Sequence, residues 1–453
     1  MQPLPKEFEE QMKRLLGEAG FFAYLDVLNQ PYARALRVNL LLRPDGTPPC
    51  PIEGLGAPVP WAKGAYFVEG DARPGLSPLH EGGLFYMQEP SALTAVTALD
   101  PQPGERVLDL CAAPGGKSTQ IAALMAGRGL LCCNEPIPSR AQILSRNIER
   151  MGVRNAVVLS AMPDALAPRF PAFFDRILVD APCSGEGMFR RQPEARDEWD
   201  TDAPRRCADR QMEILAQAAK MLRPGGTMVY STCTFNDTEN EGVLRRFLAL
   251  HPEFSLVPFA LPGLPEAKDG YLHLYPHEMR GEGHFVSRLK KADGADEADA
   301  PVQAAPQRKA PARAAAKGKA PAPIALPDVF SDAFAPERLY TAGDALWMLP
   351  EGISIERLSG LRVLRTGLLL AHAEGKRSEP DHALAMALRP EEAARTASLT
   401  QTQALAYQAG ETLSLGDLPG GYTLLCCEGV SLGWGKQAGG LMKNHYPKGL
   451  RRR

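Results

Sequence analysis

The stretch RVLDLCAAPGGKS at residues 106–118 decides the fold. Its apolar start predicts a short buried strand over 106–110, a glycine-rich turn follows, and residues 119–125 have a helical pattern. A strand, a glycine turn and a helix in this order place backbone N–H groups and a helix N-terminus at the carboxyl end of a parallel sheet, where ligands bind. The stretch therefore predicts an α/β protein with a doubly wound, Rossmann-like sheet and a ligand site at the turn.

The ligand at this turn is not a nucleoside triphosphate. Gly116, Lys117 and Ser118 imitate the end of a phosphate-binding loop, but the first glycine of that motif would fall at Cys111. The glycine fingerprint of dinucleotide-binding proteins is also absent. The second strand, over 130–135, ends in Glu135, and an acid there can accept both hydroxyls of a ribose. Together with the turn this favours S-adenosylmethionine, whose ribose would contact Glu135, although Glu135 can also be an ordinary surface acid.

Two further strands each deliver a cysteine to the same edge. Cys183 follows the run at 176–180, and Cys233 lies at the end of the run at 227–234. The first, fourth and fifth strands of a doubly wound sheet are commonly neighbours, so both thiols can lie beside one small ligand. The alternative is that both are small buried hydrophobic residues, which is common for cysteine.

Composition divides the chain into four parts. Residues 1–75 predict a small N-terminal accessory domain for RNA, 76–290 the α/β domain, 291–326 a flexible Ala/Pro/Lys-rich linker, and 327–453 a small α+β module. The linker is purely basic from 301 to 325 and could help to hold a polyanion. The last residues, 435–453, are basic and lie among Trp434, His445 and Tyr446, which predicts either phosphate contacts with base stacking or a solvated end.

The overall composition excludes several classes of protein. The sequence has 44% hydrophobic and 23% charged residues, and no apolar run reaches the ~18 residues of a membrane span. No secretory signal is readable, so we expect a cytoplasmic protein. Its nine cysteines form no C-x-x-C pair, which argues against a disulfide framework and a zinc site. Lys and Arg (51) nearly balance Asp and Glu (53), so net charge does not indicate nucleic acid.

The sequence resembles the Nop2/Sun family of RNA cytosine-C5 methyltransferases. The resemblance rests on the turn at 109–118, on DAPCSG at 180–185 and on STCT at 231–234. The longer string DAPCSGEGMFR at 180–190 and KNHYPKGLR at 443–451 resemble the bacterial 16S ribosomal RNA methyltransferase F group. The likeness spans nearly the whole chain apart from the linker.

The resemblance implies roles for individual residues. Cys233 would be the nucleophile, Cys183 would assist release, and Asp180 and Lys117 would face the target base. Many relatives have an Asp after the third strand, on the adenine side of the cofactor. Ungapped counting from Asn155 places Met162 at that position, and Asp164, two residues later, is a candidate substitute. The 327–453 module would be PUA-like and would bind RNA. The S-adenosylmethionine pocket would be lined by Cys111, Ala112, Ala113, Pro114, Gly115, Gly116, Lys117, Glu135, Asp164 and Asp180.

The implied chemistry is covalent and needs no metal. A thiolate adds to C6 of cytosine so that C5 becomes nucleophilic, and an acid or cation stabilises the charge that develops near O2 and N3. Proton donation by Asp180 would require a raised pKa. The expected partner is 16S ribosomal RNA, naked or within the small subunit, bound by a monomer. Two alternatives stay open: a DNA cytosine methyltransferase that uses Cys183 as nucleophile, and a non-enzymatic ribosome-assembly factor. Deletion of the module from 327 is expected to leave cofactor binding intact.

Overall fold

The computed structural model describes residues 3–294, 324, 328–329, 336–374 and 377–452. The predicted linker at 291–326 lies almost entirely outside the described residues. No helix in the described part of the chain has the length and apolar character that a membrane span needs.

A nine-stranded sheet forms the centre of the molecule, and its strand order is β10-β12-β9-β8-β5-β6-β7-β15, with β11 paired to β12. Strands β5 to β9 run parallel, whereas β12 runs antiparallel to β9. Because β8 lies between β5 and β9, the glycine turn and both cysteines come to one edge, as the sequence predicts. The strands are β5 (Arg106–Asp109), β6 (Leu130–Asn134), β7 (Ala156–Leu159), β8 (Phe174–Asp180), β9 (Leu222–Thr232), β10 (Phe254–Leu256), β11 (Tyr271–Leu274), β12 (His284–Lys291) and β15 (Val363–Arg365).

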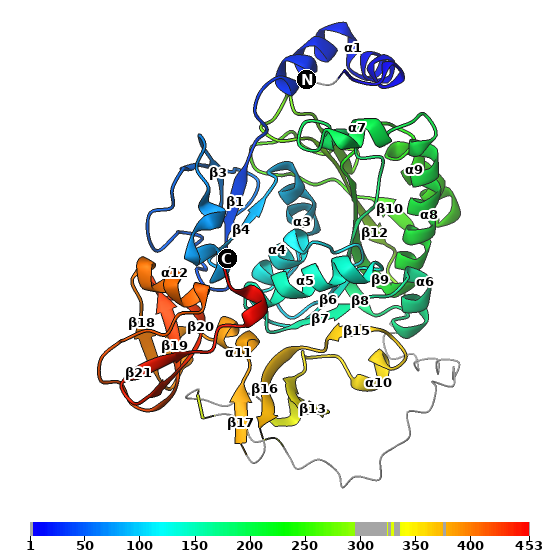
Figure 1. Cartoon of the computed structure of the whole chain (residues 1–453). Helices are drawn as coiled ribbons and strands as arrows, with labels where there is room; N and C mark the ends of the chain where they lie inside the picture. Colours follow the sequence, from blue (N-terminus) through cyan, green and yellow to red (C-terminus); the bar gives the residue numbers. More distant parts are fainter. Residues whose placement is uncertain (1–2, 295–323, 325–327, 330–335, 375–376, 453) are drawn as a thin grey trace.

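Helices cover both faces of this sheet (Figure 1), so the predicted doubly wound architecture is confirmed. One hydrophobic core lies under α3 (Thr94–Leu99), α4 (Gly116–Leu124) and α5 (Pro138–Arg150). A second core lies under α6 (Pro163–Leu166), α8 (Ala203–Met221) and α9 (Glu241–Leu250). The short helices α2 (Pro78–Glu81) and α7 (Glu194–Glu198) lie outside these layers.

The N-terminal region forms a helix and a small sheet that pack in different places. Helix α1 (Lys6–Leu28) is interrupted at Gly17, whose φ of 68° is left-handed, and its Phe8 and Met12 pack against Phe189 and Trp199 of the central domain. The sheet has the order β2-β3-β1-β4. Its strands are β1 (Ala35–Val38), β2 (Leu55–Pro58), β3 (Ala65–Val68) and β4 (Phe85–Gln88), so it extends past the predicted boundary at residue 75.

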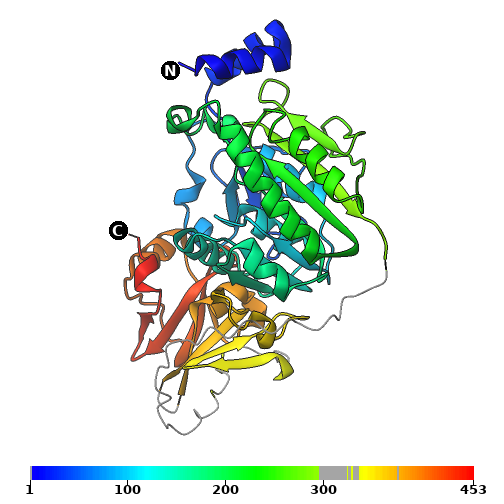
Figure 2. The ribbon, with the colours of Figure 1, turned by 90° about the vertical axis from the view of Figure 1, so that its right-hand side faces the viewer.

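The C-terminal region holds two sheets where the sequence predicts one module. The first has the order β13-β14-β16-β17 and the second β18-β19-β20-β21. Figure 2 shows both, yellow to red, against one end of the central domain. Their elements are β13 (Leu339–Ala342), β14 (Ala345–Met348), α10 (Ile355–Leu358), β16 (Leu368–Glu374), β17 (Arg377–Pro380), α11 (His382–Ala387), β18 (Thr396–Ser398), α12 (Gln401–Ala409), β19 (Gly421–Cys427), β20 (Val430–Ala438) and β21 (Leu441–Asn444).

These modules are built into the rest of the protein. Strand β15 pairs with β7 and extends the central sheet. Leu425 and Leu432 of the second module share a hydrophobic core with Leu36 and Phe85 of the N-terminal sheet. The structure therefore argues against the expectation that deletion from 327 leaves the cofactor domain undisturbed.

The aromatic residues beside the basic tail are part of the core. Trp434 is 2% and Tyr446 is 3% exposed, so neither can stack on a base, and this part of the sequence prediction is wrong. The physical reason is that both rings fill cores that the C-terminal sheets build. Arg452 donates hydrogen bonds to the carbonyls of Leu76 and Ser77, so this part of the tail docks on the N-terminal domain.

Candidate active site

A cavity of about 470 Å³ opens at the carboxyl edge of the central sheet. Asp180 from β8 and Cys233, just after β9, line it together with Glu282 and His284. Residues of β4, including Tyr86 and Gln88, close another side. The glycine turn contributes Cys111, Ala112, Ala113, Pro114, Gly116 and Lys117.

The geometry of the turn favours glycine at positions 115 and 116. Gly115 has a φ of +111°, a left-handed conformation that side chains rarely adopt. At Gly116, a Cβ atom would lie 3.2 Å from Cε1 of Tyr86, a cavity-lining residue. Below the turn, the fully buried Asp109 accepts a 2.6 Å hydrogen bond from Oγ of Ser118, and burial raises the pKa of Asp109 to about 7.

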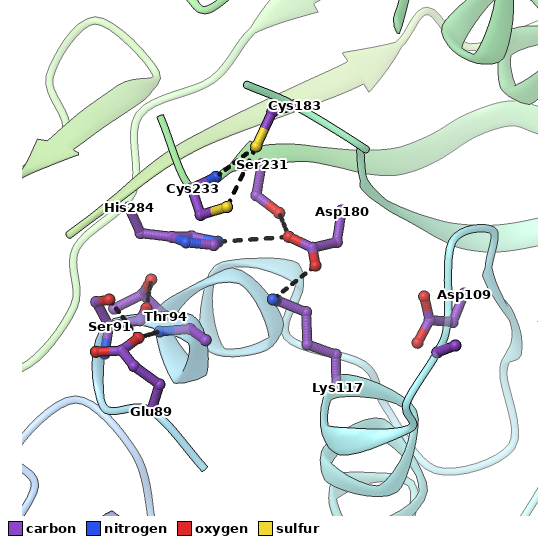
Figure 3. Close-up of polar contacts among 12 residues, drawn as sticks. Glu89, Ser91, Thr94, Asp109, Lys117, Asp180, Cys183, Ser231, Cys233 and His284 are labelled. Atoms are coloured by element: carbon purple, nitrogen blue, oxygen red, sulfur yellow. Dashed lines mark hydrogen bonds and ion pairs between the residues drawn. The ribbon is translucent and has the colours of Figure 1, made fainter. Parts of the chain in front are cut away.

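Asp180 is the centre of a polar cluster (Figure 3). Its Oδ2 accepts a 2.7 Å hydrogen bond from Nζ of Lys117, and its Oδ1 accepts one of 2.8 Å from Oγ of Ser231. Nε2 of His284 lies 3.5 Å from the same Oδ1. The structure thus brings together the two residues that the family resemblance places at the target base.

Electrostatics make Asp180 a carboxylate. Burial alone would raise its pKa, but the ammonium of Lys117 and the imidazole of His284 oppose burial and hold the pKa well below the usual range. Proton donation by Asp180 would need a raised pKa, and in this arrangement the pKa is lowered instead, because the neighbouring ammonium outweighs burial. The same pair raises the pKa of Lys117 against the effect of burial, which keeps the ammonium charged.

The two thiols are in contact. Sγ of Cys183 lies 3.2 Å from Sγ of Cys233, and the backbone N–H of Cys233 donates to Sγ of Cys183 at 3.3 Å. The hydrogen bond with Cys233, and then burial, raises the pKa of Cys183 well above its usual value. Burial and the neighbouring thiol thus both disfavour ionisation of Cys183.

Two buried carboxylates hold the cysteine loops together. Glu239 accepts hydrogen bonds from N (3.0 Å) and Oγ of Ser184, beside Cys183, and from the amides of Gln211 (2.8 Å) and Asn236 (2.9 Å). Glu186 accepts from the backbone N–H groups of Phe235 (2.8 Å) and Asn236 (3.1 Å). Both carboxylates are at most 1% exposed, so they fix the spacing of the thiols from behind the cavity.

Three predicted cofactor residues do not line the cavity: Gly115, Glu135 and Asp164. Glu135 is 2% exposed, accepts from the N–H of Ile137 at 3.0 Å and pairs with Arg140 at 3.3 Å. Asp164 is exposed on α6. Their contacts with a cofactor stay predictions.

Sequence reasoning missed Ser231, His284, Glu239 and Glu186. Ser231 is the first residue of the STCT motif and Glu239 follows the motif closely, so their short-range pattern could have suggested them. His284 begins β12, whose pairing with β9 no local pattern indicates. Among the described residues, no group of three or more His, Cys, Asp or Glu side chains is arranged to hold a metal ion.

Family models match most of the chain. The 16S rRNA methyltransferase RsmB/F model matches residues 96–290, and the N-terminal domain of 16S rRNA methyltransferase RsmF matches 4–90. The RsmF rRNA methyltransferase first C-terminal domain matches 327–388, and the methyltransferase RsmF PUA domain matches 394–452. The two C-terminal models correspond to the two C-terminal sheets.

Known proteins agree with these models. The ribosomal RNA small subunit methyltransferases F of Erwinia tasmaniensis and Klebsiella pneumoniae are each 34% identical, over 98% of this chain and 96% of theirs. A crystal structure of a methyltransferase homolog from Pyrococcus horikoshii is 30% identical, with a TM-score of 0.54, over 63% of this chain and 95% of that one. NSun6 from Pyrococcus horikoshii, solved with SFG, shares the fold at 22% identity and a TM-score of 0.55, over 64% and 99%. The chain therefore belongs to the RsmB/F family of 16S ribosomal RNA methyltransferases, with the domain set of RsmF.

Proposed function

We propose that this S-adenosylmethionine-dependent RNA methyltransferase transfers a methyl group to C5 of a cytosine in 16S ribosomal RNA, through a covalent bond between Cys233 and C6. The observation that carries the proposal is the pair of thiols 3.2 Å apart, with Cys233 and the Lys117–Asp180 ion pair lining one cavity. Covalent activation of a pyrimidine requires one thiolate nucleophile and a cation or acid near the developing charge, and the second thiol is our candidate base for the C5 proton.

The cavity fits the cofactor. Its volume is within the roughly 300–1,000 Å³ of small-molecule sites, and the glycine turn presents backbone rather than side chains to it. S-adenosylmethionine bound there supplies the methyl group. Glu135, at the end of β6, is our candidate for the ribose side, and Asp164 for the adenine side, where exposed Ile137 and Met162 follow β6 and β7.

Asp180 and Lys117 are our candidates for recognising cytosine. An ionised carboxylate accepts a hydrogen bond from the N4 amino group of cytosine, which uracil lacks. Lys117 contacts Oδ2 of Asp180, whereas Ser231 and His284 lie at Oδ1. In the proposal the ammonium of Lys117 faces O2 and N3 of the cytosine, where negative charge develops when a thiolate adds to C6.

In the proposed reaction the two thiols act one after the other, Cys233 as the nucleophile and Cys183 as the base. In this proposal Cys233 adds to C6 while Cys183 is protonated, a state of Cys183 that burial and the neighbouring thiol favour because both raise its pKa. Once Cys233 is bonded to carbon it is no longer an anion, and the largest cause of the raised pKa of Cys183 disappears. Cys183 can then lose its proton to water and, as a thiolate, accept the proton from C5 after methyl transfer. Elimination restores the C5–C6 double bond and returns Cys233 as a thiolate.

A paired base cannot enter such a cavity, so the target is unpaired or extruded. We propose that residues 1–75 and the PUA-containing region at 327–453 select RNA structure around it, with the protein acting as a cytoplasmic monomer on the free RNA or the small subunit.

Transfer of tritium from labelled S-adenosylmethionine tests the proposal. We expect label in 16S ribosomal RNA from a strain lacking this chain, none in DNA, and none with Cys233→Ala. Cys50→Ala is the matched control, because Cys50 is a partly buried thiol of the N-terminal domain outside the cavity. Label in DNA alone, or full transfer by Cys233→Ala, would overturn the proposal.

A further inference from the structure

The positive charges at the cavity are not equivalent. Three cationic side chains line it: Lys117, Arg140 and Arg191. Lys117 pairs with Asp180 at 2.7 Å, and Arg140 pairs with Glu135 at 3.3 Å. Arg191 is exposed and has no carboxylate partner in the described parts of the chain. It is therefore the lining cation available to an anion from outside.

An exposed aromatic ring lies next to this arginine. The guanidinium carbon of Arg191 is 6.0 Å from the ring centroid of Tyr32, within the range of a cation–π contact. Tyr32 is 44% exposed, although it lies in the short segment between α1 and β1 that contacts the central domain. A tyrosine ring and a guanidinium that are both exposed to solvent offer a stacking surface and a charge side by side.

One buried carboxylate holds both segments in place. Glu282, which lines the cavity, pairs with Arg190 through a 2.9 Å bond from Nε and a 2.5 Å bond from Nη2. The same carboxylate accepts from the backbone N–H of Ala33 at 3.3 Å. Its side chain is 2% exposed. Because Arg190 precedes Arg191 and Ala33 follows Tyr32, Glu282 fixes this pair at the rim of the cavity.

We propose that Arg191 and Tyr32 form a binding subsite for the nucleotide next to the target cytosine, with Arg191 on its phosphodiester and Tyr32 under its base. The proposal rests on the proposed function, because a cytosine held in the cavity carries its neighbours to the rim. A charge beside a stacking ring is the combination that proteins use for single-stranded nucleic acid. Stacking of this kind is tolerant of sequence, so the subsite contributes affinity and orientation rather than a base preference.

Salt dependence of binding tests the phosphate contact. A short unpaired RNA containing the target cytosine is titrated with wild type, Arg191→Ala and Arg128→Ala at several salt concentrations. Arg128 is the control, because it is an exposed arginine that precedes β6, at the opposite edge of the sheet from the cavity. We expect the slope of log Kd against log salt to fall by about 0.7 with Arg191→Ala and to stay unchanged with Arg128→Ala.

An RNA with an abasic neighbour tests the stacking contact. On intact RNA, Tyr32→Ala should weaken binding about five- to one-hundred-fold, and Tyr32→Phe should bind like wild type. On RNA that is abasic on the stacked side of the cytosine, Tyr32→Ala and wild type should bind equally. A wild-type midpoint of urea unfolding shows that each variant is folded.

The inference is overturned if Arg191→Ala keeps the wild-type slope. It is also overturned if Tyr32→Ala loses as much affinity as on intact RNA both on RNA that is abasic 5′ of the cytosine and on RNA that is abasic 3′ of it. Methylation by the wild type separates this failure from a failure of the proposed function. If the wild type is active but the Arg191 and Tyr32 variants bind RNA like wild type, only the subsite is refuted. If the wild type transfers no methyl group to RNA, the proposed function is refuted.

Discussion

The Glu239→Gln substitution tests whether a carboxylate is needed behind the two thiols. Oε1 of Glu239 accepts from the amide of Asn236 at 2.9 Å, and Oε2 accepts from the amide of Gln211 at 2.8 Å. Neither amide can turn over freely, because Asn236 Oδ1 accepts from the N–H of Glu239 at 2.9 Å and Gln211 Nε2 also donates to the carbonyl of Pro182 at 3.0 Å. Whichever way the new amide at position 239 is turned, its NH₂ group faces the NH₂ group of either Asn236 or Gln211.

The magnitude follows from these bonds. The variant loses at least one charge-assisted hydrogen bond, worth about 1.5–3 kcal/mol, and leaves a buried donor unpaired at about 1–3 kcal/mol. Part of this is offset, because burial already raises the pKa of Glu239 and a neutral amide is less costly to bury. We expect the free energy of unfolding to fall by about 2–4 kcal/mol. We also expect kcat to fall on the order of 10- to 100-fold, since a displacement of about 1 Å at reacting groups has that effect.

Urea unfolding, methyl-transfer kinetics and calorimetry with S-adenosylmethionine measure these changes. The affinity for S-adenosylmethionine and the KM for RNA should stay near wild type, because Glu239 does not line the cavity. Glu149→Gln is the control: it removes a carboxylate that pairs with Arg365 on β15, and it should lower stability but not kcat. Wild-type kcat for Glu239→Gln, or an equal loss of kcat for Glu149→Gln, would refute the reasoning.

Three further predictions follow from the same structure. Burial raises the folded pKa of Asp109 to about 7, above the unfolded value of about 3.9. The free energy of unfolding should therefore fall by up to ~4 kcal/mol as pH rises from about 4 to 7. Urea unfolding of Asp109→Asn should lack this pH dependence. Lys117→Met should raise the pKa of Asp180 and move the acidic limb of the kcat–pH profile toward neutral, and an unmoved limb would contradict the ion-pair argument. Truncation at residue 327 should remove β15 from β7 and abolish S-adenosylmethionine binding by calorimetry, whereas a stable truncated protein that binds it would show that the domain is independent.

The central domain was predictable because its signals are local. An apolar run followed by a glycine turn fixes a strand and a ligand-binding helix N-terminus within a short stretch, as in β5 and α4. Cys183 and Cys233 each follow such a run. Parallel pairing then brings the two thiols to one edge without any further information.

The rest depends on tertiary contacts that leave no local pattern. His284 reaches Asp180 only because β12 pairs antiparallel with β9. The low pKa of Asp180 depends on Lys117 and His284, which come from other elements, so the protonation state could not be read from the DAPCSG motif. Trp434 lies beside basic residues in the sequence, but strand β20 directs its side chain toward a hydrophobic core. Composition alone does not show which face of a strand is covered.

The central claim is that Cys233 attacks C6 and that Cys183 acts only after methyl transfer. Denaturing electrophoresis of protein incubated with RNA and S-adenosylmethionine tests it most directly. The account predicts that Cys183→Ala accumulates a protein–RNA adduct that requires S-adenosylmethionine, and that neither Cys233→Ala nor the double variant forms it. An adduct in Cys233→Ala that is absent from Cys183→Ala would make Cys183 the nucleophile and contradict the account.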